Sequence, residues 1–311
     1  MRTSAFIRII IYLVVAVICI SLLLVGLLKG TIGGMRGLDM SILNLGRYGD
    51  DEGYEISSNG QIYTTGNTTI DSIYVDWVSG RVTIEEYDGQ EIRFYEENNS
   101  NDPDLAMRFA VSNGSLRIKF SRSGNINLGL FNLIKNVVVQ VPKDYSLSIL
   151  NLNAVSSPVN VTNLNSKKLS IETTSGAVTV YNVNAERINV NTVSGQIDLN
   201  RVKADSIDIG SVSGRQYLKG ECVSLTSNTV SGAVSVVCET MLSNARFDSV
   251  SGQIELYLPE NKGFTANWDT VSGRFSCDFM SKQDRNSVVY GDGSADIRIH
   301  TVSGKISINA I

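Results

Sequence analysis

The tripeptide Val-Ser-Gly recurs along this chain of 311 residues, and its spacing limits the possible folds more than any other feature. The glycines that end the copies are Gly80, Gly176, Gly195, Gly214, Gly232, Gly252, Gly273 and Gly304, with Thr-Ser-Gly as a near copy at Gly176. From the second of these to the seventh, neighbouring copies are 18 to 21 residues apart. Self-similarity with a period of about 20 residues is typical of repeat architectures, in which each unit stacks on the next.

Apolar residues alternate with polar ones on both sides of each glycine. Around Gly195, for example, Ile188 and Val190 precede the corner, and Ile197 and Leu199 follow it. Strict alternation predicts strands with one buried face. Gln216 departs from the pattern, because it stands at a position that elsewhere holds an aliphatic residue.

Two folds can join such strands at Ser-Gly, an antiparallel meander of hairpins or a solenoid whose coils turn at this corner. A hairpin would pair the repeated valine with a mostly polar row and leave it exposed. At a solenoid corner the valine can point inward and stack on its copies, while glycine tolerates positive φ and the serine hydroxyl holds nearby backbone groups. The sequence therefore predicts an all-β, single-stranded parallel β-solenoid with coils of about 19 residues, each burying five or six aliphatic side chains.

The amino-terminal region predicts one transmembrane helix. Residues 9–28 form an uncharged run of 20, long enough to span about 30 Å of hydrocarbon. The run is too long for a signal peptide, and no small-residue cleavage pattern follows it. We expect a cytoplasmic tail at 1–8, the anchor at 9–28, a Gly-rich polar stalk at 29–68 and the solenoid at 69–311. The expected location is the cell membrane, in a single pass with the carboxy-terminal domain outside the cytoplasm.

The repeats are similar to those of the putative-adhesin family of bacterial envelope proteins. The residues that carry the resemblance are the Thr-Val-Ser-Gly repeats, V-V-Q-V-P-K at 138–143, Y-L-P at 257–259 and the ending Y-G-D-G-S-A-D-I-R-I-H-T-V-S-G-K-I-S-I at 290–308. The resemblance implies a β-solenoid surface domain beside a membrane span. It supplies no catalytic residues.

One set of residues could carry chemistry. Asp248, Asp269 and His300 each stand four residues before a corner glycine, in three successive repeats. Equivalent residues of stacked coils lie about 4.8 Å apart, so the two carboxylates could act as a retaining glycosidase pair or bind Ca²⁺. The same column holds Asn153 and Asn191, so a polar ladder is the favoured interpretation. We expect no catalytic residue, cofactor or metal, and keep these three only as weak candidates.

The cysteines and the charge exclude several classes of protein. Cys222 and Cys238 could form a disulfide, which their spacing does not decide, and Cys277 occupies an aliphatic position that favours a small buried thiol. With a net charge of −4 and no basic stripe, nucleic acid is not an expected partner.

These features favour a membrane-anchored envelope protein whose solenoid binds or scaffolds without catalysis, with a glycan or an envelope protein as partner. The alternatives are an envelope-stress sensor, or regulatory partner of a membrane protein, and a polysaccharide-active enzyme. The final strand, 305–311, could be an open edge through which copies associate. The insertion at 279–293 could instead fold over that end as a cap.

Overall fold

The computed structural model describes residues 51–58, 60–98, 102–122 and 133–311. The chain divides into two compact units, 1–49 and 50–311, and all the described residues lie in the second. Strands are the regular elements of this unit, β1 to β22. Among the described residues, no helix is long and apolar enough to cross a membrane. The predicted tail 1–8, the predicted anchor 9–28 and most of the predicted stalk lie outside the described residues.

The middle of the chain forms the expected solenoid, with each strand parallel to the next. Its elements are β9 (Ser146–Ser156), β10 (Val159–Thr173), β11 (Val178–Thr192), β12 (Ile197–Ser211) and β13 (Gln216–Thr229). Equivalent residues of successive repeats lie opposite one another, so Val159 is opposite Val178, and Val178 is opposite Ile197. The long strands bend within each coil, where Asn163, Asn182 and Arg201 have φ near +54°.

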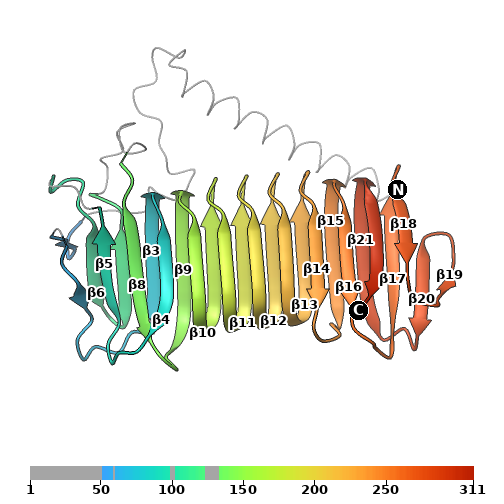
Figure 1. Ribbon diagram of the computed structural model, residues 1–311, viewed down its shortest axis with the longest axis horizontal. Helices are drawn as coiled ribbons and strands as arrows, with labels where there is room; N and C mark the ends of the chain where they lie inside the picture. Colours follow the sequence, from blue (N-terminus) through green and yellow to red (C-terminus); the bar gives the residue numbers. More distant parts are fainter. Residues whose placement is uncertain (1–50, 59, 99–101, 123–132) are drawn as a thin grey trace, which may run out of the picture. The chain divides into compact units, whose positions relative to one another are not determined.

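Each coil contributes to two parallel ladders, one before and one after its corner glycine (Figure 1). The first ladder has the order β7, β3, β9, β10, β11, β12, β13, β15, β21, β17. The second has the order β8, β4, β10, β11, β12, β13, β14, β16, β22, β18. The long strands β10 to β13 take part in both. The later strands are β14 (Val234–Cys238), β15 (Asn244–Ser251), β16 (Ile254–Leu258), β17 (Gly263–Thr270) and β18 (Arg274–Cys277).

The last coil of the sequence is not the last coil of the stack. It consists of β21 (Ala295–Ser303) and β22 (Lys305–Ala310), which lie between the coils of Gly252 and Gly273. In Figure 1, red β21 stands between β15 and β17. The prediction that 305–311 is an open edge for self-association is therefore wrong, because β22 is paired on both sides.

The insertion at 279–293 folds over the end of the first ladder, where it covers β17, and not over the strand 305–311 that it was expected to cap. It forms β19 (Lys282–Gln283) and β20 (Ser287–Gly291), and β20 pairs antiparallel with β17. The rings of Phe264, Phe279 and Tyr290 contact one another here, with centroids 4.8 to 5.6 Å apart. Antiparallel strands thus cover the outer side of β17.

The amino-terminal end is also out of sequence order and is covered on both ladders. The coil of β3 (Ser72–Ser79) and β4 (Val82–Tyr87) lies between the coil of β9 and β10 and the outer strands β7 (Ser115–Lys119) and β8 (Asn136–Pro142). On one side β6 (Arg108–Ser112) runs antiparallel to β7, and β1 (Glu55–Ile56) runs antiparallel to β6. On the other side β5 (Arg93–Glu97) runs antiparallel to β8, and β2 (Tyr63–Thr64) runs antiparallel to β5. Because β1 and β2 belong to this cap, residues 51–68 are not the stalk that the sequence predicted.

The corner differs from its prediction in one residue and in the role of glycine. None of the seven repeated valines is buried, and Val193 and Val271 are 45% and 75% exposed. The preceding residue points inward instead: Thr173, Thr192, Ser211, Thr229, Ser249 and Thr301 are all buried. Thr192 turns inward because its hydroxyl caps the corner, accepting a hydrogen bond from the N–H of Gly195 at 2.9 Å.

Close stacking, more than positive φ, requires glycine at these corners. Only Gly80, Gly252 and Gly304 among the corner glycines have positive φ. At Gly195 a Cβ atom would lie 1.9 Å from the carbonyl oxygen of Gly176 in the next coil. The corner serines behave as expected, since the Ser175 hydroxyl donates to the carbonyl of Val155 at 3.3 Å.

Aliphatic side chains fill most of the interior, and in one layer Gln216 takes the place of an aliphatic residue. The coil that begins after Gly176 buries Val178, Val180, Val183, Ile188 and Val190, each at most 1% exposed, which agrees with the predicted five or six aliphatic residues. Gln216, the exception noted in the sequence, is 1% exposed and fully bonded. Its amide donates to the Ser211 hydroxyl and the Asn228 carbonyl, and its oxygen accepts from the Ser227 hydroxyl at 2.6 Å.

A buried ion pair joins the segments of the amino-terminal cap. The Lys135 ammonium lies 2.8 Å from Glu96, and both side chains are at most 1% exposed. Lys135 also donates to the carbonyl of Leu105, and Glu96 accepts from the N–H of Met107. Burial lowers the pKa of Lys135, and Glu96 opposes that shift.

Candidate functional site

The structure places Asp248, Asp269 and His300 in one column of the first ladder, but in a different order from the predicted one. His300 is opposite Asp248 on one side and opposite Asp269 on the other. The histidine therefore separates the two carboxylates by two strand spacings, about 9.6 Å between Cα atoms. This order follows from the insertion of β21 between β15 and β17.

The separation removes the predicted pair of neighbouring carboxylates. Both oxygens of Asp248 are already engaged by Arg246, at 2.6 Å to Nε and 3.1 Å to Nη2. Asp269 is exposed on the far side of His300. Among the described residues, no three His, Cys, Asp or Glu side chains are grouped closely enough to hold a metal ion. The column has the geometry of a polar ladder on the outer face.

The same column continues across the whole first ladder. From the amino-terminal end it contains Lys119, Asp76, Asn153, Glu172, Asn191, Gly210, Asn228, Asp248, His300 and Asp269. At its covered end, Asp76 is 6% exposed and accepts a hydrogen bond from Asn153 at 2.8 Å. Burial raises the pKa of Asp76 to about 6, against the opposing effects of Asn153, Lys119 and Arg117.

A second feature, the corner groove, crosses several coils on another part of the surface. It has a volume of about 530 Å³ and follows residues nine to eleven before each corner glycine. Its rims carry polar and charged side chains from successive coils: Asn165, Asn184, Lys203 and Glu221 on one side, and Lys167, Glu186 and Asp205 on the other. Asn184 donates to Asn165 at 3.1 Å, and Lys203 lies 2.8 Å from Glu221.

Small residues line the corner groove between its rims. They are Ser166, Ala185, Ala204 and Cys222, in four successive coils. In the preceding coil the same column holds Leu147, opposite Ser166 and fully buried. The fold therefore accepts a large aliphatic residue here, and the small residues are a property of these four coils. The sequence analysis did not find this groove, although a column of small residues ten positions before the glycines was its signal.

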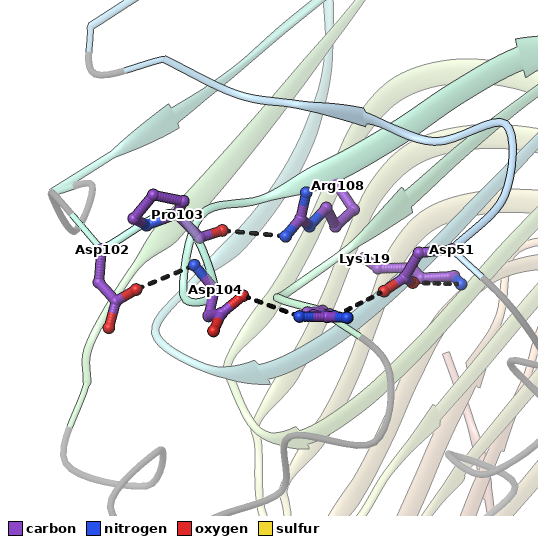
Figure 2. Close-up of polar contacts among 7 residues, drawn as sticks. Asp51, Asp102, Pro103, Asp104, Arg108 and Lys119 are labelled. Carbon is purple, nitrogen blue, oxygen red and sulfur yellow. Dashed lines mark hydrogen bonds and ion pairs between the residues drawn. The ribbon is translucent and has the colours of Figure 1, made fainter.

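A third polar cluster lies at the amino-terminal cap (Figure 2). Asp51 lies 3.5 Å from the Lys119 ammonium and 3.9 Å from Arg122, and Arg122 lies 3.3 Å from Asp104. The backbone N–H of Asp104 donates a hydrogen bond of 2.9 Å to the carboxylate of Asp102, which positions Asp104. These charges pair with one another across separate segments, so the cluster fastens the cap.

The three cysteines in the described part of the chain are free. The alternative of a disulfide between Cys222 and Cys238 is therefore not realised. Burial raises the pKa of Cys222 to about 11 and that of Cys238 to about 12. Cys277 is only partly buried, contrary to its prediction, because β18 has no strand on its outer side among the described residues.

Stacked parallel coils, with corners closed by hydrogen bonds and a polar outer face, define a β-solenoid repeat protein. Residues 70–309 match the Toastrack DUF4097 family, and the chain belongs to that family. Comparison with curated proteins gives no match.

Several solved structures are similar to this chain, and three of them are described below. A putative lipid binding protein from Parabacteroides distasonis is 16% identical, with a TM-score of 0.48 over 80% of this chain and 97% of that one. A putative cell adhesion protein from Clostridium sporogenes is 12% identical, with a TM-score of 0.25 over 81% and 98%. A putative adhesin from Bacteroides fragilis is 13% identical, with a TM-score of 0.34 over the same shares. Similarity this low says nothing of what this chain binds.

Proposed function

We propose that this chain is a membrane-anchored protein of the cell envelope whose solenoid is a non-catalytic binding or scaffolding module. Residues 9–28 anchor it, and the solenoid lies outside the cytoplasm. Its partner is a glycan chain or another envelope protein. The sequence of the span and the family support the location, and the geometry of the surface supports binding without turnover.

The corner groove is the observation that carries this proposal. A concave surface with convergent polar groups is the usual place for a ligand, and this groove repeats the same set of rim positions once per coil. A polymer that lies across the strands would meet equivalent side chains about every 4.8 Å. Asn165, Asn184 and Glu186 offer donors and acceptors for hydroxyl or amide groups. By contrast, Asp248 is bound to Arg246, and its neighbours in the column are Asn228 and His300.

Binding is tested with the full chain in detergent on an array of bacterial envelope glycans. We expect retention of at least one glycan without release of shorter products. Ala204→Leu places in the groove the residue that its column carries at Leu147, and should abolish retention. Asp208→Asn, on the flat outer face of the first ladder, is the matched control and should leave retention unchanged.

Two results would contradict the proposal. Cleavage of a retained glycan that Asp269→Asn abolishes would establish an enzyme. Retention that survives Ala204→Leu, with an unchanged melting temperature, would place binding elsewhere. If no glycan is retained, the same pair of variants is compared by crosslinking in intact cells, where loss of every crosslinked envelope protein in Ala204→Leu alone supports the protein partner.

The location is tested by protease accessibility. A protease added to intact cells, after removal of the cell wall, should digest the solenoid and leave a fragment that contains residues 9–28. Digestion only after the membrane is broken would show that the solenoid is cytoplasmic.

A further inference from the structure

The second ladder ends at β18, whose outer edge has no neighbouring strand in the described part of the chain. On its inner side, the N–H of Arg274 donates to the Gly304 carbonyl at 3.1 Å, and that of Asp278 to the Ile308 carbonyl at 2.9 Å. Backbone groups of alternate residues point to opposite sides of a strand. The N–H and C=O groups of Phe275 and Cys277 therefore point away from the stack.

The side chains of this strand also differ from those of every other coil at the same positions. Phe275 and Cys277 point toward the interior but are only partly buried, whereas Ile306 and Ile308, their partners on β22, are fully buried. The Phe275 ring stacks on Trp268, with centroids 3.7 Å apart. The apolar interior of the solenoid thus reaches the surface beside β18.

The end of the stack has the form of a step. In the described part of the chain, the first ladder continues beyond β17 with β20 and β19, while the second ends at β18 (Figure 1). If a second copy paired its β18 here through a two-fold axis, its own β20 would occupy the space already filled by β20 and β19. The place beside β18, which no described strand occupies, fits an extended segment one or two strands wide and excludes a second folded end.

We propose that the edge of β18 binds an extended segment of a partner polypeptide as an added β-strand. Main-chain hydrogen bonds to Phe275 and Cys277 supply affinity in this mode of recognition, and alternate side chains supply specificity. The segment carries two apolar residues, one position apart, that cover Phe275 and Cys277. It carries an acidic residue opposite Arg274 and a basic residue opposite Asp278, both of which are exposed on the outer face. This site is separate from the corner groove and does not depend on its ligand.

Two synthetic peptides of equal composition test the proposal, one containing Glu-Ile-Ser-Ile-Lys and the other the reverse order. The first matches the charges of β18 in a parallel orientation, and the second in an antiparallel one. Hydrogen exchange of the full chain in detergent, resolved to single residues, is measured with and without each peptide. We expect the amides of Phe275 and Cys277 to exchange freely alone, and at least about tenfold more slowly with one of the two peptides. The amides of Arg274 and Asp278, already bonded to the carbonyls of Gly304 and Ile308, are the internal control.

Two lysine variants separate strand addition from other binding. Cys277→Lys places a charge on the inner side of the edge, where it can reach solvent until an added strand covers it, and should abolish the protection. Ser276→Lys adds the same charge on the outer face and should retain it. Equal protection in both variants, or no protection by either peptide at millimolar concentration, overturns the proposal.

Two outcomes without peptide also overturn it. Slow exchange of Phe275 and Cys277 at every protein concentration would mean that another part of the same chain covers the edge. Protection that grows with protein concentration would identify a second copy as the occupant.

Discussion

The side-chain oxygen of Thr192 accepts a hydrogen bond of 2.9 Å from the backbone N–H of Gly195, across the corner of one coil. The same bond joins Thr173 to Gly176, Thr229 to Gly232 and Thr270 to Gly273, at 2.8 to 3.1 Å. The unit that repeats is therefore Thr-Val-Ser-Gly, in which threonine is the inward residue and valine faces outward. The corner closes by a local hydrogen bond, and the next coil stacks directly on its glycine.

Replacing the capping threonine tests this account of the corner. Thr192→Val keeps the volume and removes the oxygen, so the buried N–H of Gly195 loses its acceptor. We expect the free energy of unfolding to fall by about 1–3 kcal/mol. Val193→Thr, one residue further on and 45% exposed, should change it by less than about 0.5 kcal/mol. Urea denaturation measures both, and a larger loss in Val193→Thr would contradict the assignment of inward and outward residues.

Because the corner glycines of neighbouring coils stack closely, replacing one should lower the free energy of unfolding more than replacing the capping threonine does. In Gly195→Ala the new Cβ would lie 1.9 Å from the Gly176 carbonyl oxygen, so the two coils must move apart. We expect a loss of about 2–4 kcal/mol, within the range of strongly destabilising substitutions. Ser194→Ala removes an exposed hydroxyl with its hydrogen bond of 3.4 Å to the Thr174 carbonyl and is the control, with a change of about 0.5 kcal/mol or less. Comparable melting temperatures for the two variants would show that the coils are not in contact at this glycine.

Asp76 should make the stability of the solenoid depend on pH. Because burial raises its pKa from 3.8 to about 6, the native state binds more protons than the unfolded state between these values. Stability from this group is present below pH 4 and is lost as the pH rises through 6. At pH 7, Asp76→Asn should therefore raise the free energy of unfolding by about 2 kcal/mol.

The same variant should change the free energy of unfolding by only about 0.3 kcal/mol at pH 3.5, where the wild-type carboxyl is protonated in the native state and mostly protonated in the unfolded state. Asp205→Asn, at an exposed rim of the corner groove, is the matched control and should be neutral at both values. A destabilised Asp76→Asn at pH 7 would mean that the carboxylate gains more from its partners than it loses by burial.

The cysteines should react in a fixed order. With pKa values of about 11 and 12, Cys222 and Cys238 carry less than about one part in 500 of thiolate at pH 8 and are also shielded. In a Cys19→Ser background, iodoacetamide should label Cys277 at least about tenfold faster than either. The fast phase should disappear in Cys277→Ser. Alkylation after unfolding without reductant should add three groups to the parent chain, and a single group would reveal a disulfide between Cys222 and Cys238.

The sequence was sufficient to predict the coil, because every coil repeats the same alternation of apolar and polar residues. A departure in one coil, such as Gln216, does not hide the pattern that the other coils share. Period, strand positions and the inward aliphatic residues such as Ile188 and Val190 follow from that redundancy. The valine was misassigned because Val and Thr are both β-branched and adjacent, and alternation breaks at a bend. Only the hydrogen bond to Gly195 distinguishes which of the two turns inward.

The ends of the stack could not be predicted in the same way. Sequence order gives no sign that the coil of Gly304 inserts before the coil of Gly273, because both carry the same repeat. The spacing of 31 residues between these glycines indicates an insertion, and the insertion contains β20. Sequence order predicts Asp248 and Asp269 as neighbours in the candidate column, but the order of the coils places His300 between them. The sequence analysis missed the corner groove because Ser166, Ala185, Ala204 and Cys222 differ in type, and a column of varied small residues does not by itself indicate a groove.

The order of the last three coils is the central claim, since both the separated carboxylates and the open edge of β18 follow from it. Engineered disulfides test it directly, because Cα atoms must lie within about 7 Å. In the parent without Cys19, Cys222, Cys238 and Cys277, we expect the pair Asp248→Cys and His300→Cys to crosslink under mild oxidation. The pair Asp248→Cys and Asp269→Cys should remain reduced, about 9.6 Å apart. Intact mass and gel mobility distinguish the states, and the opposite result, a bond in the second pair and none in the first, would contradict the account.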